Sequence, residues 1–409
     1  MGKVERDFYP PRRKLPLVRL AQFLAPTWAF VTQRIWLEAD YDSLRILSEL
    51  RRDRVLLLPN HPTFQDPVVS FLLSGVTGEN FYFLSAVELF DSPLAPFFQG
   101  IGVYSIRRGL SDRASIAQTI DLLTQPGCHL VIFPEGGCSF QNDTVMPFRA
   151  GGVQLAFQAL NRFAKQGEPI PDLYVVPVAI KYFYRRDMTR VIRQTMAQLE
   201  RSLGITPVKA DNYQRLRAIA QKVLVKVEQD YGMHSSDVAS KSWNERIERL
   251  REQVLAHCER ALGLPINSAE ALRERTYRIE YALKQRADAL ESAESTETDA
   301  ASESLRKYRL LEKSVKRLLN FDAIYDGYVA ENPTPERFLD TLVRLEREVF
   351  DIDQPPPKSF RKAVLKVGEP INLKDWFEQY RSDRGKTVND LTLKIQQAVQ
   401  TNLDLLNQS

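Results

Sequence analysis

Between Arg54 and Tyr182, short apolar runs of strand length alternate with segments of helical periodicity. The strand candidates are Val55–Leu58, Phe81–Ser85, Gly102–Ile106, His129–Phe133 and Leu173–Ile180. The helical patterns between them cover Pro67–Ser74, Arg113–Leu123 and Val153–Phe163. Because parallel strands need long crossover connections, which are usually helices, this alternation predicts an α/β domain with a largely parallel sheet.

After Tyr184 the pattern changes to apolar residues spaced three or four positions apart, as in amphipathic helices. Such helices are predicted at Leu216–Val227, Trp243–Leu262, Leu305–Leu319 and Pro335–Phe350. The acidic stretch Ala287–Leu305 lacks Lys and Arg and has few large apolar groups. It is therefore predicted to be a flexible acidic loop or an exposed helix end.

One more strand candidate, Lys362–Leu373, lies far from the others and precedes a helical pattern at Thr387–Leu405. A single strand cannot stand alone, because its edges must pair. We therefore expect it to return to the first sheet, which gives an α/β fold with a single mixed, largely parallel sheet flanked by helices and split by a long all-helical insertion. The alternative is an independent C-terminal αβ piece.

The net charge of +4 lies in the first twenty residues, where basic side chains outnumber Glu5 and Asp7. These basic residues are Lys3, Arg6, Arg12, Arg13, Lys14 and Arg19. A short basic arm on a chain whose remaining residues carry no net charge suits binding to an anionic lipid surface. Binding to nucleic acid normally needs a basic face across the domain. A solvated tail is the alternative.

The segment Leu15–Leu37 is rich in apolar and aromatic residues but is interrupted by Arg19, Pro26 and Arg34. No window reaches the roughly 18 uncharged apolar residues of a spanning helix. The segment is predicted to lie in the membrane interface, or else to pack on the protein's own core. No secretory signal is visible, so we expect a peripheral location on the cytoplasmic side of a membrane.

The three cysteines, Cys128, Cys138 and Cys258, show no paired spacing. They fit neither a disulfide framework nor a zinc site, which favours a reducing compartment. No metal or redox cofactor is indicated.

Four short blocks stand at or near strand ends, where open α/β sheets bind their ligands. They are Asn60-His61-Pro62-Thr63-Phe64-Gln65-Asp66, Ile106-Arg107-Arg108, Phe133-Pro134-Glu135-Gly136 and Val176-Pro177-Val178. Taken alone, the spacing of His61 and Asp66 also fits an ordinary turn. Pro177 within a strand predicts an edge position or a bulge.

In this order the blocks resemble the glycerolipid acyltransferase family, which contains lysophosphatidate and glycerol-3-phosphate acyltransferases and is marked by an HxxxxD motif and an FPEG block. The segments Pro147–Gly152 and Val367–Ile371 resemble the family's flanking segments. The resemblance covers about Arg54–Tyr184 and Lys362–Leu373.

The domains expected from these patterns are four. Residues 1–45 form a basic N-terminal arm and an amphipathic membrane-contact helix, and residues 46–184 form the first part of the acyltransferase α/β domain. Residues 185–360 form a helical insertion with an acidic linker at 287–305. Residues 361–409 supply the closing strand and helix of the acyltransferase domain.

Acyl transfer to an alcohol needs a base for the hydroxyl proton and a group that orients the base. His61 is suited to be the base, since imidazole titrates near neutrality, and Asp66 to hold its other ring nitrogen. No G-x-S-x-G segment marks a serine nucleophile. Cys138 is the alternative nucleophile, although a cysteine in a turn is more often inert. His129, inside an apolar run, is expected to be structural.

Guanidinium groups bind phosphate oxygens bidentately, so Arg107 and Arg108 are expected to hold an acceptor phosphate. The resemblance implies that Glu135 and the amides of Gly136 and Gly137 hold the acceptor. The remaining substrate-binding candidates in the same blocks are Asn60, Ser139, Arg149 and Pro177.

The third block departs from many lysophosphatidate acyltransferases, which continue it with Thr-Arg-Ser where this chain has Gly137-Cys138-Ser139. The phosphate charge is then expected to come from Arg149 or from the pair of Arg107 and Arg108. The aromatic segment Phe81–Gly102 either lines an acyl groove or contacts lipid, or is core and connecting loop.

The resemblance implies transfer of a fatty acyl group from acyl carrier protein or acyl-coenzyme A to the hydroxyl of a glycerophosphate-type acceptor, foremost 1-acylglycerol-3-phosphate, in phospholipid biosynthesis. The expected partners are a membrane lipid surface, the acceptor and the donor, and no nucleic acid. Two other classes stay open: a lipid-binding or scaffolding protein with this fold, and a lipid transacylase or hydrolase.

Overall fold

The computed structural model describes residues 8–109, 111–206, 210–233, 240–293, 299–322 and 324–408, with the side chains of 287–293, 299–305 and 408 left aside. Lys3 and Arg6 of the basic arm lie outside these residues. The chain divides into two compact units. The sheet unit comprises Met1–Arg107, Asp112–Arg186 and Ser359–Ser409, and the helical unit comprises Arg108–Ser111 and Asp187–Lys358.

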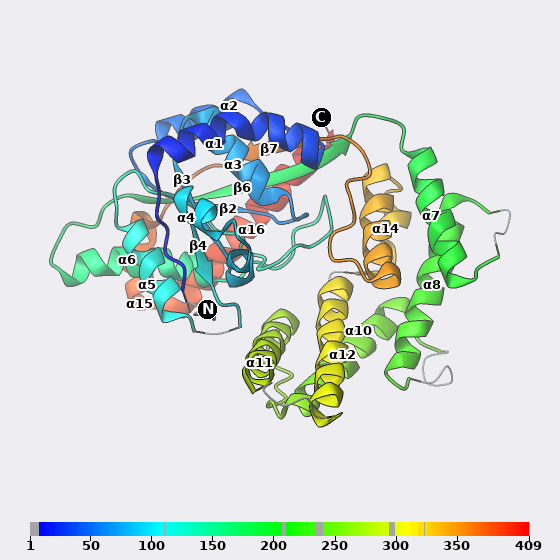
Figure 1. Cartoon of the computed structure of the whole chain (residues 1–409). Helices are drawn as coiled ribbons and strands as arrows, with labels where there is room; N and C mark the ends of the chain where they lie inside the picture. Colours follow the sequence, from blue (N-terminus) through cyan, green and yellow to red (C-terminus); the bar gives the residue numbers. More distant parts are fainter. Residues whose placement is uncertain are drawn as a thin grey trace. The chain divides into compact units, whose positions relative to one another are not determined.

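The sheet unit is built on one eight-stranded sheet (Figure 1). Its strands are β1 (Ile35–Ala39), β2 (Arg54–Pro59), β3 (Phe81–Ala86), β4 (Val103–Ile106), β5 (His129–Val131), β6 (Leu173–Tyr184), β7 (Arg361–Val367) and β8 (Ile371–Asn372). The order is β1-β7-β6-β2-β5-β3-β4, with β8 also paired to β6. The pairs from β6 to β4 are parallel, whereas β7 and β8 run antiparallel to β6. The predicted mixed, largely parallel sheet is confirmed.

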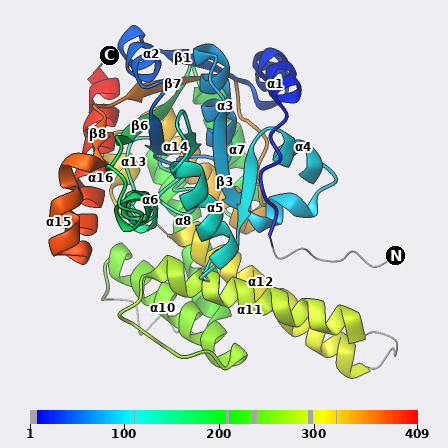
Figure 2. The ribbon, with the colours of Figure 1, turned by 90° about the vertical axis from the view of Figure 1, so that its left-hand side faces the viewer.

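Helices cover both faces of this sheet (Figure 2). One face carries α5 (Arg113–Leu123), α6 (Gly151–Lys165), α15 (Phe377–Ser382) and α16 (Arg384–Gln408), and the other carries α1 (Leu15–Trp28), α2 (Tyr41–Glu49), α3 (Asp66–Thr77) and α4 (Ala95–Gly100). Successive side chains of a strand point to opposite faces. Accordingly Leu56 and Leu58 join the first apolar cluster, and Val55 and Leu57 join the second. Burial on both faces explains why β2 is apolar throughout its middle.

The late strand β7 lies inside the sheet, between β1 and β6. It pairs antiparallel with β6 from Val178 opposite Val367 to Tyr184 opposite Arg361, and parallel with β1. The predicted all-helical insertion in a single sheet is therefore confirmed, and the alternative of an independent C-terminal piece is wrong.

Of the two alternatives for Leu15–Leu37, packing on the protein's own core holds at its C-terminal end. Helix α1 continues into a π-helical turn, Ala29–Gln33, and the chain then leaves the helix at Arg34, whose φ is 53°. β1 starts at the next residue, Ile35, which is fully buried. The strand is short, and its apolar residues continue the aromatic run of the helix, so no break in hydropathy marks it.

For Pro177 the predicted edge position is wrong, because β6 lies in the interior of the sheet. The alternative, a bulge, is confirmed: between the pairs Val178–Val367 and Val175–Ile371, the three residues 368–370 lie opposite only two residues of β6, 176 and 177. Pro177 pairs with Leu58 of β2 on one side. On the other side its carbonyl accepts a hydrogen bond of 2.8 Å from Gly368, where the chain turns between β7 and β8. The missing N–H of Pro177 faces this turn, so no ladder hydrogen bond is lost there.

The helical unit consists of amphipathic helices joined by buried ion pairs. Its helices are α7 (Thr189–Leu203), α8 (Asn212–Asp230), α10 (Trp243–Leu262), α11 (Leu272–Ala293), α12 (Asp299–Phe321), α13 (Tyr328–Glu331) and α14 (Pro335–Phe350). Buried or nearly buried pairs are Arg215–Glu200, Arg246–Glu228, Arg275–Glu259 and Arg317–Glu348. The backbone on either side of 294–298 forms helix ends, but residues 294–298 themselves and the side chains of the acidic stretch lie outside the described part of the chain.

Candidate active site

Two loops meet at the carboxyl ends of the neighbouring strands β2 and β5. His61 lies in the turn from β2 to α3, and Glu135 and Ser139 lie in the loop after β5. The Glu135 carboxylate accepts the His61 main-chain N–H at 2.8 Å, and the Ser139 main-chain N–H donates to the His61 carbonyl at 2.8 Å. Glu135 and Ser139 are both buried. The backbone of His61 is thus held from both sides by the loop that carries the FPEG block.

Two asparagines fix these loops to strand β6. The Asn60 amide donates to the Ile180 carbonyl at 3.0 Å and accepts the Ile180 N–H at 2.7 Å. Asn142 brackets Tyr182 in the same way, at 2.6 and 2.7 Å. Both asparagines are buried. The side chain of Asn60, which the sequence predicts to bind substrate, therefore holds the turn that carries His61.

Asp66 is the fully buried carboxylate of the site and lies at the N-terminus of α3. Oδ2 of Asp66 lies 2.7 Å from Nδ1 of His61 and accepts a hydrogen bond from the Thr63 N–H at 2.8 Å. Oδ1 accepts hydrogen bonds from the Thr63 hydroxyl at 2.9 Å and the Tyr182 hydroxyl at 2.6 Å. A buried carboxylate is tolerated only with such donors, and the helix N-terminus favours its negative charge. Burial and the Asp66 charge raise the pKa of Tyr182, which keeps this hydroxyl a donor.

The bond to Asp66 turns the other ring nitrogen of His61, Nε2, toward the loop after β5. There Nε2 lies 3.6 Å from Sγ of Cys138, and the imidazole packs on the Phe133 ring with centroids 4.4 Å apart. Burial lowers the pKa of His61, but the neighbouring Cys138 sulfur and the Asp66 carboxylate outweigh it and hold this pKa well above its ordinary value. The Cys138 sulfur also lies 3.9 Å from Nδ1, so it sits beside the imidazole ring and not on the line from Asp66 through Nε2.

Arg149 is the arginine that lies against the FPEG turn. Its main-chain N–H donates to the Pro134 carbonyl at 2.9 Å, and its guanidinium packs on Gly136. A Cβ at position 136 would lie 2.9 Å from Cζ of Arg149, and φ of Gly136 is +75°, so only glycine fits. Gly137, half-buried, joins this turn to Cys138.

The remaining predicted site residues have partners elsewhere. Arg107 follows the edge strand β4, and its main-chain N–H and guanidinium contact Asp112, the N-cap of α5, at 3.0 and 3.6 Å. Arg108 belongs to the helical unit, where its guanidinium stacks on Tyr277 and pairs with Glu280 at 3.4 Å. Pro177 is buried in the sheet against Gly368.

His129 is structural, as the sequence indicates. It is buried, one ring nitrogen lies 3.1 Å from the Leu50 carbonyl, and burial lowers its pKa. It is therefore held neutral inside the core.

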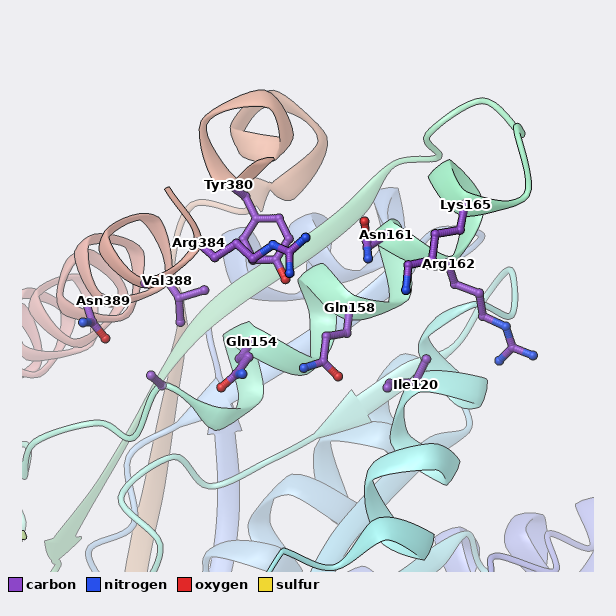
Figure 3. Close-up of a pocket in the computed structure, with 12 residues that line it drawn as sticks. Ile120, Gln154, Gln158, Asn161, Arg162, Lys165, Tyr380, Arg384, Val388 and Asn389 are labelled. Carbon is purple, nitrogen blue, oxygen red and sulfur yellow. The ribbon is translucent and has the colours of Figure 1, made fainter. Parts of the chain in front are cut away.

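A separate cavity of about 570 Å³ lies between α6, α15 and α16 (Figure 3). Its lining is largely polar, with Gln154, Gln158 and Asn161 facing Tyr380 and Arg384. Neither His61 nor any residue of the FPEG block lines this cavity. Its polarity does not suit an acyl chain, and we assign it no part in acyl transfer.

The structure places a His–carboxylate pair at the carboxyl ends of the parallel strands of an α/β fold. A family model described as Acyltransferase matches residues 44–181. The match covers about a third of the chain, the part that contains β2 to β5 and most of β6, and it supports the resemblance of the sequence blocks to the glycerolipid acyltransferase family. The domain is accordingly that of a lipid O-acyltransferase. No curated protein matches the chain.

Proposed function

We propose that this protein transfers a fatty acyl group from a thioester donor, acyl carrier protein or acyl-coenzyme A, to the hydroxyl of a glycerophosphate-type acceptor, with 1-acylglycerol-3-phosphate as the leading candidate. The observation that carries the proposal is the His61–Asp66 pair, 2.7 Å apart at the carboxyl edge of the acyltransferase domain.

In this mechanism His61 is the general base. Its Nε2 takes the proton of the acceptor hydroxyl while the oxygen attacks the acyl thioester carbonyl, and the imidazolium then protonates the departing thiolate. Asp66 stabilises the imidazolium, and the Thr63 and Tyr182 hydroxyls keep Asp66 in place. The products are an oxygen ester and a free thiol.

Arg149 is the group we assign to the acceptor phosphate. It packs on Gly136 in the turn that also supplies Glu135 to the His61 backbone. The Arg149 guanidinium supplies a positive charge beside the FPEG turn, where many lysophosphatidate acyltransferases have an arginine and this chain has Cys138. Arg107, which follows the edge strand β4 and is held by Asp112, is the secondary candidate.

The substrate assignment is tested by incubating purified protein in detergent with labelled acyl-coenzyme A or acyl carrier protein. The acceptor panel contains glycerol-3-phosphate, lysophosphatidate, lysophospholipids and neutral glycerides, and the products are separated by lipid class. Label in the diacyl phosphatidate fraction supports the proposal. Label released only as free fatty acid indicates a hydrolase, and lipid binding without any transfer indicates a scaffold; either result overturns it.

Replacing Asp66 by asparagine should shift the acidic limb of the pH profile of kcat/KM. Asp66 is one of the groups that raise the pKa of His61, and only the neutral imidazole accepts a proton. In Asp66→Asn the acidic limb of kcat/KM for the acceptor is therefore expected to move to lower pH, while the maximal rate falls. Asp172→Asn, which changes an exposed carboxylate, is the control. If the acidic limb of kcat/KM does not move in Asp66→Asn, a group other than His61 controls that limb.

The outer face of α1 is proposed to bind the membrane surface. Val18, Gln22 and Ala25 of α1 are buried, whereas large apolar side chains on its other face are exposed. The exposed large apolar residues of α1 and the following turn are Leu15, Leu20, Phe23, Leu24, Trp28, Phe30 and Val31. Within the described residues, no helix combines the length and the apolar composition of a bilayer-spanning segment.

Vesicle sedimentation tests this surface. A fully buried apolar side chain contributes about 1.5–3 kcal/mol, so the double variant Phe23→Ser and Trp28→Ser should bind vesicles containing phosphatidylglycerol at least about tenfold more weakly. The matched control replaces two exposed leucines of α16, Leu393 and Leu405, by serine. Equal losses in both double variants would contradict a role for α1.

A further inference from the structure

Arg361 is a buried cation that lies behind the His61–Asp66 pair. It is the first residue of β7 and is 9% exposed. Its Cζ lies 4.6 Å from the centroid of the Tyr182 ring, and its Nη2 donates to Oε1 of Gln65 at 3.2 Å. One guanidinium thus contacts a side chain of β6 and a side chain of the turn that carries His61.

Both contacts of Arg361 lead to Asp66. The Tyr182 hydroxyl donates to Oδ1 of Asp66 at 2.6 Å, and Gln65 directly precedes Asp66 at the start of α3. A guanidinium is attracted to the negative face of an aromatic ring, most strongly where water is excluded. The stacked guanidinium therefore restrains the ring whose hydroxyl holds the carboxylate.

The burial of Arg361 is itself unusual, because a buried charge is costly unless it is paired. In the described part of the chain, its Nε makes no hydrogen bond and no carboxylate forms an ion pair with its guanidinium. The buried carboxylate that it reaches, through Tyr182, is Asp66. Burial and the Asp66 charge raise the pKa of Tyr182, and the Arg361 charge opposes this rise. The positive and the negative charge thus act on one and the same side chain.

We propose that Arg361 is a positioning residue for acyl transfer, which keeps the Asp66 carboxylate on Nδ1 of His61 by fixing the Tyr182 ring and the Gln65 side chain. The inference rests on the proposed function, in which His61 is the base. Arg361 contacts neither a substrate nor the reacting atoms in this scheme. Its loss should therefore lower kcat and leave KM nearly unchanged.

The first test needs no substrate. The Nδ1 proton of His61, hydrogen-bonded to a buried carboxylate, should give a downfield NMR signal that is absent in His61→Ala. Arg361→Met, which removes the charge and keeps an unbranched apolar side chain, should lose or broaden this signal. The main-chain N–H of Arg361, which donates to the Arg34 carbonyl at 2.8 Å, is retained. If Arg361→Met does not fold, Arg361→Lys replaces it, because lysine keeps the charge but not the planar fork.

Lys362→Met is the matched control. Lys362 is the next residue of β7, so its side chain points to the opposite face of the sheet, where it pairs with Glu38 at 3.3 Å. The His61 signal and kcat should both be unchanged in this variant. Circular dichroism and thermal unfolding confirm that each variant is folded.

Steady-state kinetics with the acceptor that the panel identifies give the second readout. Because a small displacement of a catalytic group costs up to about 10²-fold, Arg361→Met should lose at least about tenfold in kcat, with KM within about twofold. Tyr182→Phe should also lower kcat. Since Arg361 acts largely through the Tyr182 hydroxyl, the double variant should lose much less than the product of the two single losses.

The outcomes separate this inference from the proposed function. An unchanged His61 signal in a folded Arg361 variant, an unchanged kcat, or single losses that simply multiply in the double variant would overturn the role of Arg361 and leave the proposed function standing. A His61 signal that depends on Arg361, in a wild-type protein that forms no ester, would support the positioning role and overturn the proposed function instead.

Discussion

Replacing His61 by alanine is expected to abolish most acyl transfer and to leave the protein folded. General-base catalysis contributes about 10²–10⁴-fold, and kcat/KM should fall by at least that range. The fold should survive because Glu135 and Ser139 bind the main chain of His61, which alanine retains. Asp66 keeps its hydrogen bonds from Thr63 and Tyr182, so its buried carboxylate is not left without donors.

The measurement is kcat/KM for label transfer, with circular dichroism and thermal unfolding as checks on the fold. His257→Ala is the matched control, because this exposed histidine lies on α10 of the helical unit, where its ring makes an edge contact with the Tyr231 ring. A folded His61→Ala protein with more than about a tenth of wild-type activity would remove His61 from the base role.

The largest stability effect is expected from Glu259 in the helical unit. Its carboxylate is fully buried and binds both nitrogens of the Arg275 fork, at 3.0 and 2.8 Å, while Arg275 itself is 1% exposed. Removing one partner of a buried pair costs about 3–5 kcal/mol. Without Glu259, the buried Arg275 keeps only the half-exposed Glu252, at 3.0 Å, of its two carboxylate partners among the described residues, so we expect a loss near the lower end of this range. Glu259→Ala should therefore lower the Tm of this unit by on the order of 10 °C.

Thermal unfolding followed by circular dichroism measures this loss. Lys316→Ala, which breaks an exposed pair with Asp353, is the control and should change the free energy of unfolding by less than about 1 kcal/mol. The double variant Glu259→Leu and Arg275→Met should recover part of the loss, since apolar replacement of a buried pair is often neutral or stabilising. A Glu259→Ala protein as stable as its control would show that the Glu259–Arg275 pair does not stabilise the helical unit.

Most of the sheet could be predicted from sequence because its strands are buried on both faces and therefore stand out as apolar runs. Even the return of β7 follows from the rule that strand edges must pair. β1 could not be predicted, since it continues the aromatic run of α1 and its boundary is a single left-handed residue, Arg34. The position of Pro177 in the interior of the sheet could not be predicted either, because it depends on the turn at Gly368, almost 200 residues later in the chain.

In the site, the pair of His61 and Asp66 was predictable because both residues lie in one turn. Tyr182 and Asn142 were not, because no local pattern links them to Asp66 or to β6. The main-chain role of Glu135 and the structural role of Asn60 likewise depend on contacts between distant loops. Cys138 was visible in the third block, but only the fold places its sulfur beside Nε2 of His61.

The position of β7 also affects how the chain is made. In the described sheet, β1 has β7 as its neighbour, and the flank of β6 away from β2 is filled by β7 and β8. Both strands leave the ribosome only after residues 187–358 of the helical unit. At about 5–20 residues per second, that interval lasts on the order of 10–30 s. The nascent chain therefore carries an open strand edge for this time, a period in which chaperone binding or mispairing competes with closure by its own C-terminal strand.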